Sequence, residues 1–101
     1  MNHFGEKIKE LREQKGLLQK HIASRLDIDT PMLSKIERGE RKAKREQVPI
    51  LAKALTTDKD DLLSLWLADK VYDVVKDENV ALRAIQVAEE EIKYEKTKKA
   101  R

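Results

Sequence analysis

The sequence contains no cysteine and is poor in glycine, proline and aromatic residues: its 101 residues include three Gly, two Pro, two Tyr, one Trp and one Phe. Without cysteine the chain has no disulfide, no thiol nucleophile and no cysteine ligand for a metal. No apolar run approaches the roughly 18 residues of a membrane span, and residues 1–10 lack the apolar core of a signal peptide. We therefore expect a cytoplasmic protein that does not associate with a membrane.

Charge is abundant and unevenly distributed. A length of 101 residues suits one domain with a modest core and an appended element. Charged residues make up 41% of the chain and hydrophobic residues 40%, and with few Gly and Pro this favours a helix-rich chain with much solvated surface. Residues 1–57 contain 13 Lys or Arg and 8 Asp or Glu, a net charge of +5, whereas residues 58–101 contain 9 and 11, a net charge of −2. This division suits nucleic-acid contact in the first part and protein contact in the second, although uneven charge also arises by chance.

The segment from Gly16 to Arg41, GLLQKHIASRLDIDTPMLSKIERGER, predicts two short helices joined by a tight turn, over residues 19–26 and 30–38. Apolar residues at helical spacing form an inner face on both helices, namely Ile22, Ala23, Leu26, Leu33 and Ile36. Asp29 can cap the second helix, Pro31 is tolerated in its first turn, and Gly39 can end it. Its outer face and the basic loop after it suit a groove lined with phosphates.

These residues resemble the Xre/Cro/cI-type helix-turn-helix proteins, the phage-repressor-like bacterial regulators. The matching features are Gln19 at the start of the first helix, Ala23 within it, and the sequence SKIERG from Ser34 to Gly39. The resemblance covers residues 4–63 and extends to repressors, activators, antitoxins and restriction–modification controllers. One position departs from the family, because Leu18 stands where a capping Ser or Thr is usual, a loss of about 1 kcal/mol.

The resemblance assigns roles to residues in and around the two helices. It implies a buried ion pair between Arg12 and Glu37, which would hold the second helix against the scaffold; two separate solvated charges are the alternative. It also implies that Gln19 contacts a DNA phosphate through its side chain and the free amides of the helix start.

We divide the other candidate DNA contacts by the chemistry of their side chains. The base-reading candidates are Thr30, Pro31, Ser34 and Lys35, of which Lys35 suits a guanine edge. The phosphate-contact candidates are Arg38, Arg41, Lys42 and Lys44; for Lys42 and Lys44 a solvated loop is nearly as good an interpretation. Met32 either touches a thymine methyl group or packs inside.

Four further helices are expected around this pair, over residues 4–15, 45–55, 59–76 and 78–96. Pro49 constrains the second of these to begin near residues 44–46. The stripes Phe4, Ile8, Leu11 and Val48, Leu51, Ala52, Leu55 should face the core. Residues 97–101, TKKAR, are expected to form a frayed tail.

The last two helices carry more apolar surface than one small domain can cover. We expect this surface to form a homodimer interface made of Trp66, Val71, Val74, Val75, Ala81, Ile85, Ala88 and Ile92. Trp66 and Tyr72 lie in the acidic part, which favours the core or this interface over base stacking. A second small hydrophobic lobe within a monomer is the alternative.

No catalytic or metal-binding group emerges from the sequence. His3 and His21 are far apart and have no clustered co-ligands, so zinc is not expected. Glu89, Glu90 and Glu91 fit a solvated helix face better than general acid–base catalysis. We expect no cofactor, no small-molecule effector and no enzymatic activity.

The sequence therefore predicts an all-α protein with a phage-repressor-like five-helix domain at residues 1–63, a dimerisation extension at residues 64–96 and a tail at residues 97–101. The predicted function is a dimeric repressor or autoregulator that reads a palindrome in double-stranded DNA with helix 30–38 in the major groove. The alternative is an interaction protein, such as an antitoxin, whose C-terminal helices bind a different protein.

Overall fold

The computed structural model describes residues 2–99, and over this range the chain contains six α-helices and no strand. The helices are α1 (His3–Gln14), α2 (Gln19–Leu26), α3 (Thr30–Arg38), α4 (Gln47–Ala54), α5 (Lys59–Val75) and α6 (Ala81–Lys99). The predicted all-α class and the bounds predicted for α2 and α3 are confirmed. None of the helices in the described range is both long enough and apolar enough to cross a bilayer.

The backbone forms two compact units, one up to Val71 and one from Tyr72 onward. The division falls inside α5, so this helix ends the first unit and begins the second. The sequence places a functional boundary earlier, at residue 63. Where DNA binding ends and dimerisation begins along the chain stays a prediction.

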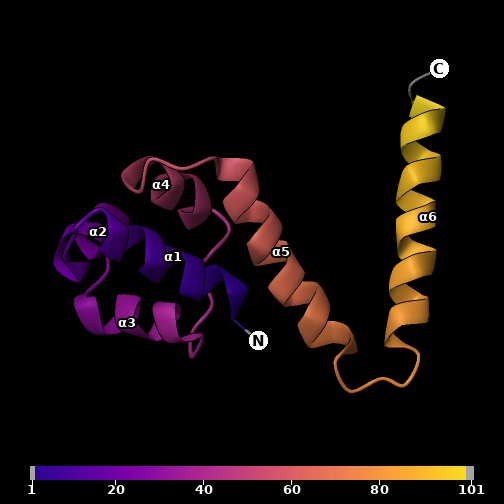
Figure 1. Cartoon of the computed structure of the whole chain (residues 1–101), viewed down its shortest axis with the longest axis horizontal. Helices are drawn as coiled ribbons and strands as arrows, with labels where there is room; N and C mark the ends of the chain where they lie inside the picture. Colours follow the sequence, from indigo (N-terminus) through magenta and orange to yellow (C-terminus); the bar gives the residue numbers. More distant parts are fainter. Residues whose placement is uncertain (1, 100–101) are drawn as a thin grey trace. The chain divides into compact units, whose positions relative to one another are not determined.

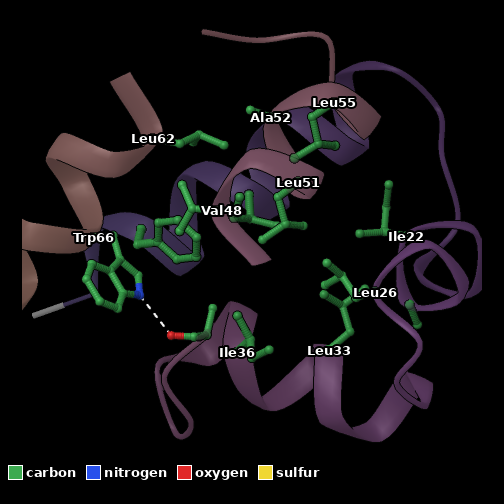
Figure 2. Close-up of a cluster of buried hydrophobic side chains, with 14 residues drawn as sticks. Ile22, Leu26, Leu33, Ile36, Val48, Leu51, Ala52, Leu55, Leu62 and Trp66 are labelled. Carbon is green, nitrogen blue, oxygen red and sulfur yellow. Dashed lines mark hydrogen bonds between the residues drawn. The ribbon is translucent and has the colours of Figure 1, made fainter. Parts of the chain in front are cut away.

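The first unit is built around one hydrophobic core to which its five helices and the loop before α4 all contribute (Figure 2). Its buried apolar residues are Phe4, Ile8, Ile22, Ala23, Leu26, Leu33, Ile36, Ala43, Val48, Leu51, Ala52, Leu55, Leu62 and Trp66. Leu11, predicted to face inward, is partly buried at the edge of this cluster. The stripes read from the sequence are thus the ones that pack, and the apolar area they bury is the main stabilising contribution.

Two helix contacts position α3, since both α1 and α2 pack against it, and α2 also packs against α4. Figure 1 shows α3 on the opposite side of α1 from α4, at the edge of the first unit. Gly5 of α1 is required at the α1–α3 contact because a Cβ there would overlap the carbonyl oxygen of Ile36. One face of α3 is therefore held by the scaffold while the other is left for solvent.

Four helix ends share one geometry, in which a residue one or two positions after the helix is left-handed and two backbone N–H groups bond back to the last turn. These residues are Gly16, Asp27, Gly39 and Thr56. Glycine and aspartate tolerate this conformation, whereas Thr56, at φ 52°, is β-branched and adopts it at a cost in free energy. Each of the four loops that connect α1 to α5 therefore begins with a C-terminal helix cap of this kind.

Two helices begin or end later than the sequence predicts. The predicted start of α4 at residues 44–46 is corrected to Gln47, because residues 44–48 form tight turns in which Gln47 and Val48 donate to the carbonyls of Lys44 and Arg45. Pro49 then lies in the first turn, where its missing N–H costs nothing.

The last helix, α6, begins at Ala81 rather than 78 and reaches Lys99. Asn79 favours the preceding turn over a helix. Residues 97–99, predicted as a frayed tail, are helical, and the basic residues of this last turn suit the negative end of the helix dipole. Residues 100–101 lie outside the described residues.

The second unit exposes most of its apolar side chains. In the single chain, α6 buries none of its residues. Its large exposed apolar side chains are Leu82, Ile85, Val87, Ile92 and Tyr94. This surface is as the sequence predicts, and its occupant is considered below.

Candidate nucleic-acid interface

The turn between α2 and α3 sets the direction of α3. Asp27 is left-handed at φ 57°, and the N–H of Ile28 returns to the carbonyl of Ala23 at 3.0 Å. Asp29 then caps α3, because its carboxylate accepts a hydrogen bond of 2.8 Å from the amide of Met32. Only three residues separate the helices, so both sides of the turn are fixed by backbone hydrogen bonds. A rigid turn of this kind is what a helix-turn-helix requires.

The outer face of α3 carries the predicted base-reading residues. Leu33 and Ile36 are buried on the inner face. On the other side Pro31 and Lys35 are exposed, and Thr30 and Ser34 are partly exposed. The structure therefore brings the four candidates onto one accessible helix face. Met32 is partly buried against the core, the inward of its two alternatives.

Arg38, at the end of α3, takes part in a small polar cluster. Its guanidinium donates to Ser34 Oγ one turn earlier and pairs with the carboxylate of Glu40. All three side chains are accessible to solvent, so exchanging Glu40 for a phosphate would cost little. No pattern in the sequence indicates that Glu40 pairs with Arg38, and this carboxylate competes with DNA for the charge of a predicted phosphate contact.

Glu37 is the most deeply buried charged residue of the site, with 4% of its surface exposed. Arg12 of α1 binds it with two hydrogen bonds, from Nε to Oε2 at 2.7 Å and from Nη2 to Oε1 at 3.1 Å. Gln19 Nε2 donates to Oε1 at 3.0 Å, and Arg12 Nη1 donates to the carbonyl of Leu17 at 3.0 Å. The structure thus brings together the two residues assigned to the ion pair and joins α1, α2 and α3 through one carboxylate.

This pairing shifts the pKa of Arg12. The hydrogen bonds to Glu37 raise the pKa of the guanidinium above its ordinary value, and burial opposes them. For the guanidinium, a raised pKa means that its contribution to stability is fully present below the ordinary arginine value and is lost as pH rises through the higher folded value. The pair is therefore constant across the physiological range.

Gln19 lies at the start of α2, as predicted, but its side chain is engaged within the protein by Glu37. Its second amide N–H and the backbone amides of the first turn are the groups that a phosphate could use. Leu18 supplies no capping acceptor for the first-turn amides, but its own amide donates to Nδ1 of His21 at 3.2 Å. The role of Gln19 toward DNA stays a prediction.

The loop after α3 presents the remaining basic side chains. Gly39 is left-handed at φ 79°, and the amides of Glu40 and Arg41 both donate to the carbonyl of Lys35. Arg41, Lys42 and Lys44 are exposed, whereas Ala43 between them is buried. The loop is thus pinned at its centre with cations on either side. Arg45 is also exposed here and extends the basic surface beyond the predicted set.

Two polar residues that sequence reasoning missed hold the start of α1. Asn2 caps α1 through a 3.1 Å bond from the amide of Gly5 and donates from Nδ2 to the carbonyl of Glu37 at 2.8 Å. Asp69 of α5, 8% exposed, accepts hydrogen bonds from the amides of His3 and Phe4 at 3.1 and 2.9 Å. The available signal was a carboxylate on the same helical face as Leu62 and Trp66.

The residues assigned to the dimer interface have different environments. Val71, Val74, Ala88, Ile85 and Ile92 are exposed, and Val75 and Ala81 are partly buried. Trp66 is corrected to the core: it is 8% exposed, and its indole N–H donates to the carbonyl of Ala43 at 2.8 Å (Figure 2). Its indole therefore has little surface left for a second chain. Among the described residues, no three His, Asp or Glu side chains are grouped as metal ligands.

Comparison with known proteins identifies the first unit. A family model described as a helix-turn-helix domain matches residues 3–66, more than half of the chain. No curated protein and no solved structure is significantly similar to the chain. The match begins at the start of α1 and ends at Trp66, so it covers α1 to α4 and the first part of α5.

Proposed function

The chain belongs to the helix-turn-helix domain family, and from this premise we propose that it is a sequence-specific DNA-binding transcriptional regulator of the Xre/Cro/cI type. Helix α3 enters the major groove, and the loop from Gly39 to Lys44 follows the phosphate backbone beside it. The protein acts as a cytoplasmic repressor or autoregulator. A restriction–modification controller is one member class that fits its size.

The observation that carries the proposal is the division of α3 into two faces. Leu33, Ile36 and Glu37 fix the helix to the scaffold. The opposite face offers Lys35 beside the small Thr30 and Ser34, which allow a base edge to come close. The cations of the adjoining loop supply attraction for phosphates that is independent of base sequence. Specific DNA binding requires base-contacting side chains on a rigid helix together with nearby cations that bind phosphates, and α3 and the adjoining loop provide both.

The direct test is selection of bound duplexes from a random DNA library, followed by a footprint on the selected site and on the DNA upstream of its own coding region. We expect one protected site with two-fold symmetry. Equal binding to all duplexes, with no protected site, would contradict a sequence-specific function. Protection of the upstream DNA would support autoregulation, and protection elsewhere only would support control of other genes.

We also propose that a second copy of the chain covers the apolar face of α6. Ala81, Ile85, Ala88 and Ile92 recur at spacings of four, three and four, the repeat by which two helices pack along a seam. None of these residues is buried in the single chain. A dimer of this kind would present two copies of α3, which suits a palindromic site.

We expect Lys35→Ala to reduce discrimination at one base pair. The ammonium group of Lys35 is exposed on the reading face, so its loss should cost about 1–3 kcal/mol at the preferred base and little at others. The measurement is binding to the selected operator and to three variants at each position of a half-site. Unchanged discrimination at every position would mean that Lys35 does not read a base.

Arg41→Ala is the matched control, since it removes one cation from the loop rather than from the reading face. It should weaken binding to operator and random DNA by the same factor and reduce the salt dependence of log Kd by about one unit. A change in base preference with Arg41→Ala would place that residue among the readers. The two variants together separate specificity from general attraction.

A further inference from the structure

One face of α5 touches the core, the basic loop after α3 and the start of α1. Leu62 lies in the core, Trp66 Nε1 holds the carbonyl of Ala43 in the basic loop, and Asp69 holds the first amides of α1. These residues are four and three apart and share one side of the helix. Lys70, next along the chain, lies over the Trp66 ring at 4.2 Å from its centroid. On this face of α5, Asp69 therefore occupies a position where a helix packed on a hydrophobic core usually carries an apolar residue.

The carboxylate of Asp69 accepts hydrogen bonds from the first amides of α1, and these amides could find partners without a buried charge. The first amides of any helix lack partners within the helix. In α1 the side chain of Asn2 satisfies Gly5, and exposed first amides usually bind water. Here the amides of His3 and Phe4 instead bind both oxygens of a buried charge from a residue 65 or more positions away. A buried charge is costly unless it is well paired, so this contact fixes geometry as well as adding stability.

The start of α1, which Asp69 holds in place, is in turn hydrogen-bonded to α3. Asn2 lies between the two contacts: its backbone precedes the amides held by Asp69, and its Nδ2 donates to the carbonyl of Glu37. A side chain at Gly39 would collide with Asn2, and one at Gly5 would collide with both Asn2 and Ile36. These close approaches and the Asn2 hydrogen bond connect the start of α1 directly to the last turn of α3, which carries Lys35 and Arg38.

We propose that Asp69 is a positioning residue for DNA recognition. Through the start of α1 and the side chain of Asn2, it holds the C-terminal turn of α3 at a fixed placement relative to α5. This inference rests on the proposed function, since it assigns to Asp69 a part in the accuracy of base reading. Asp69 itself touches no DNA in this arrangement. Its effect is on how α3 is presented, and therefore on discrimination.

The test uses Asp69→Asn in the full chain, with Asp61→Asn as its matched control on the same helix. Both variants remove one negative charge, but Asp61 is exposed. An amide in place of Asp69 keeps one acceptor and loses the second. We expect Asp69→Asn to lower the ratio of operator to random-DNA affinity by about 3- to 30-fold and Asp61→Asn to leave it within about twofold. Loss of folded protein alone lowers both affinities equally, so this ratio reports positioning and not stability.

A second variant tests the route through Asn2 and serves if Asp69→Asn does not fold. Asn2→Asp keeps a cap for α1 but loses the donor to the Glu37 carbonyl. It should lower the same ratio, and the double variant should lose less than the product of the two single effects.

The outcomes separate the two proposals. A wild-type ratio near one would overturn the proposed function. A high wild-type ratio that Asp69→Asn and Asn2→Asp leave unchanged would overturn the role of Asp69 alone. Independent, multiplicative losses would keep Asp69 as a positioning residue and exclude its action through Asn2.

Discussion

Replacing Glu37 by Gln is expected to lower the free energy of unfolding by about 3–5 kcal/mol, because it leaves the guanidinium of Arg12 without its carboxylate in a mostly buried site. Arg12→Met should cost a similar amount, since it leaves the Glu37 charge with Gln19 as its remaining side-chain partner. The double variant should cost much less than the sum, because it strands neither charge. Urea unfolding of the four proteins measures this coupling.

Glu13→Gln is the control for this double-mutant cycle. Glu13 pairs with Lys9 at 3.9 Å on the exposed side of α1 and acts on Arg12 only as a weak, more distant charge, and such exposed pairs contribute less than about 1 kcal/mol. The coupling between Arg12 and Glu37 should also be the same at about pH 7 and pH 10, because the raised pKa of Arg12 keeps it charged throughout. Additive effects of the two single substitutions would show that the contact contributes no pairwise stability.

The second large effect is expected from Ile85→Asp in α6. This substitution places a charge in the proposed seam between two copies and should shift the protein to the monomer. Operator affinity should then fall by about 10²- to 10⁴-fold, because the second half-site contact ceases to be intramolecular. The circular-dichroism signal of the first unit should persist, since Ile85 lies outside its core. Sedimentation at several concentrations and operator titration are the two measurements.

Gln86→Asp introduces the same charge one residue along, away from the seam, and should leave the dimer intact. A wild-type chain that stays monomeric at high micromolar concentration and still binds its site at full strength would contradict the dimer. The apolar face of α6 would then belong either to a second hydrophobic lobe within the monomer or to a binding site for a different protein. A different protein partner, as in an antitoxin, would leave the wild type monomeric until that partner is added.

The parts of the fold that the sequence predicted well are those set by local chemistry. Gly16 and Gly39 end α1 and α3, and Asp29 begins α3 by capping it, so the bounds of α2 and α3 follow from neighbouring residues. The apolar stripes of α1 and α4 have one helical period and one face, so their core residues were also predictable. The candidate readers follow from the same periodicity, since the inner face of α3 leaves one outer face.

The parts that the sequence did not predict depend on contacts between distant residues. Asp69 meets α1 across 65 positions, and no local pattern marks a carboxylate that caps another helix. The apolar residues of α5 lie on more than one face, so periodicity could not decide that Trp66 faces the core while Val74, 77% exposed, does not. The roles of Arg38 and Gln19 were likewise predicted without their partners Glu40 and Glu37, which only the folded arrangement provides.

Because Trp66 is hydrogen-bonded to Ala43, its intrinsic fluorescence is sensitive to the contact between α5 and the loop after α3. Trp66 is the only tryptophan in the chain, it is buried, and it joins α5 to the loop that carries the proposed phosphate contacts. Separation of α5 from that loop would expose the indole to water and move its emission to longer wavelength, while helix content could remain unchanged. The emission wavelength of Trp66 thus reports, without any added label, whether α5 is still in contact with the loop after α3.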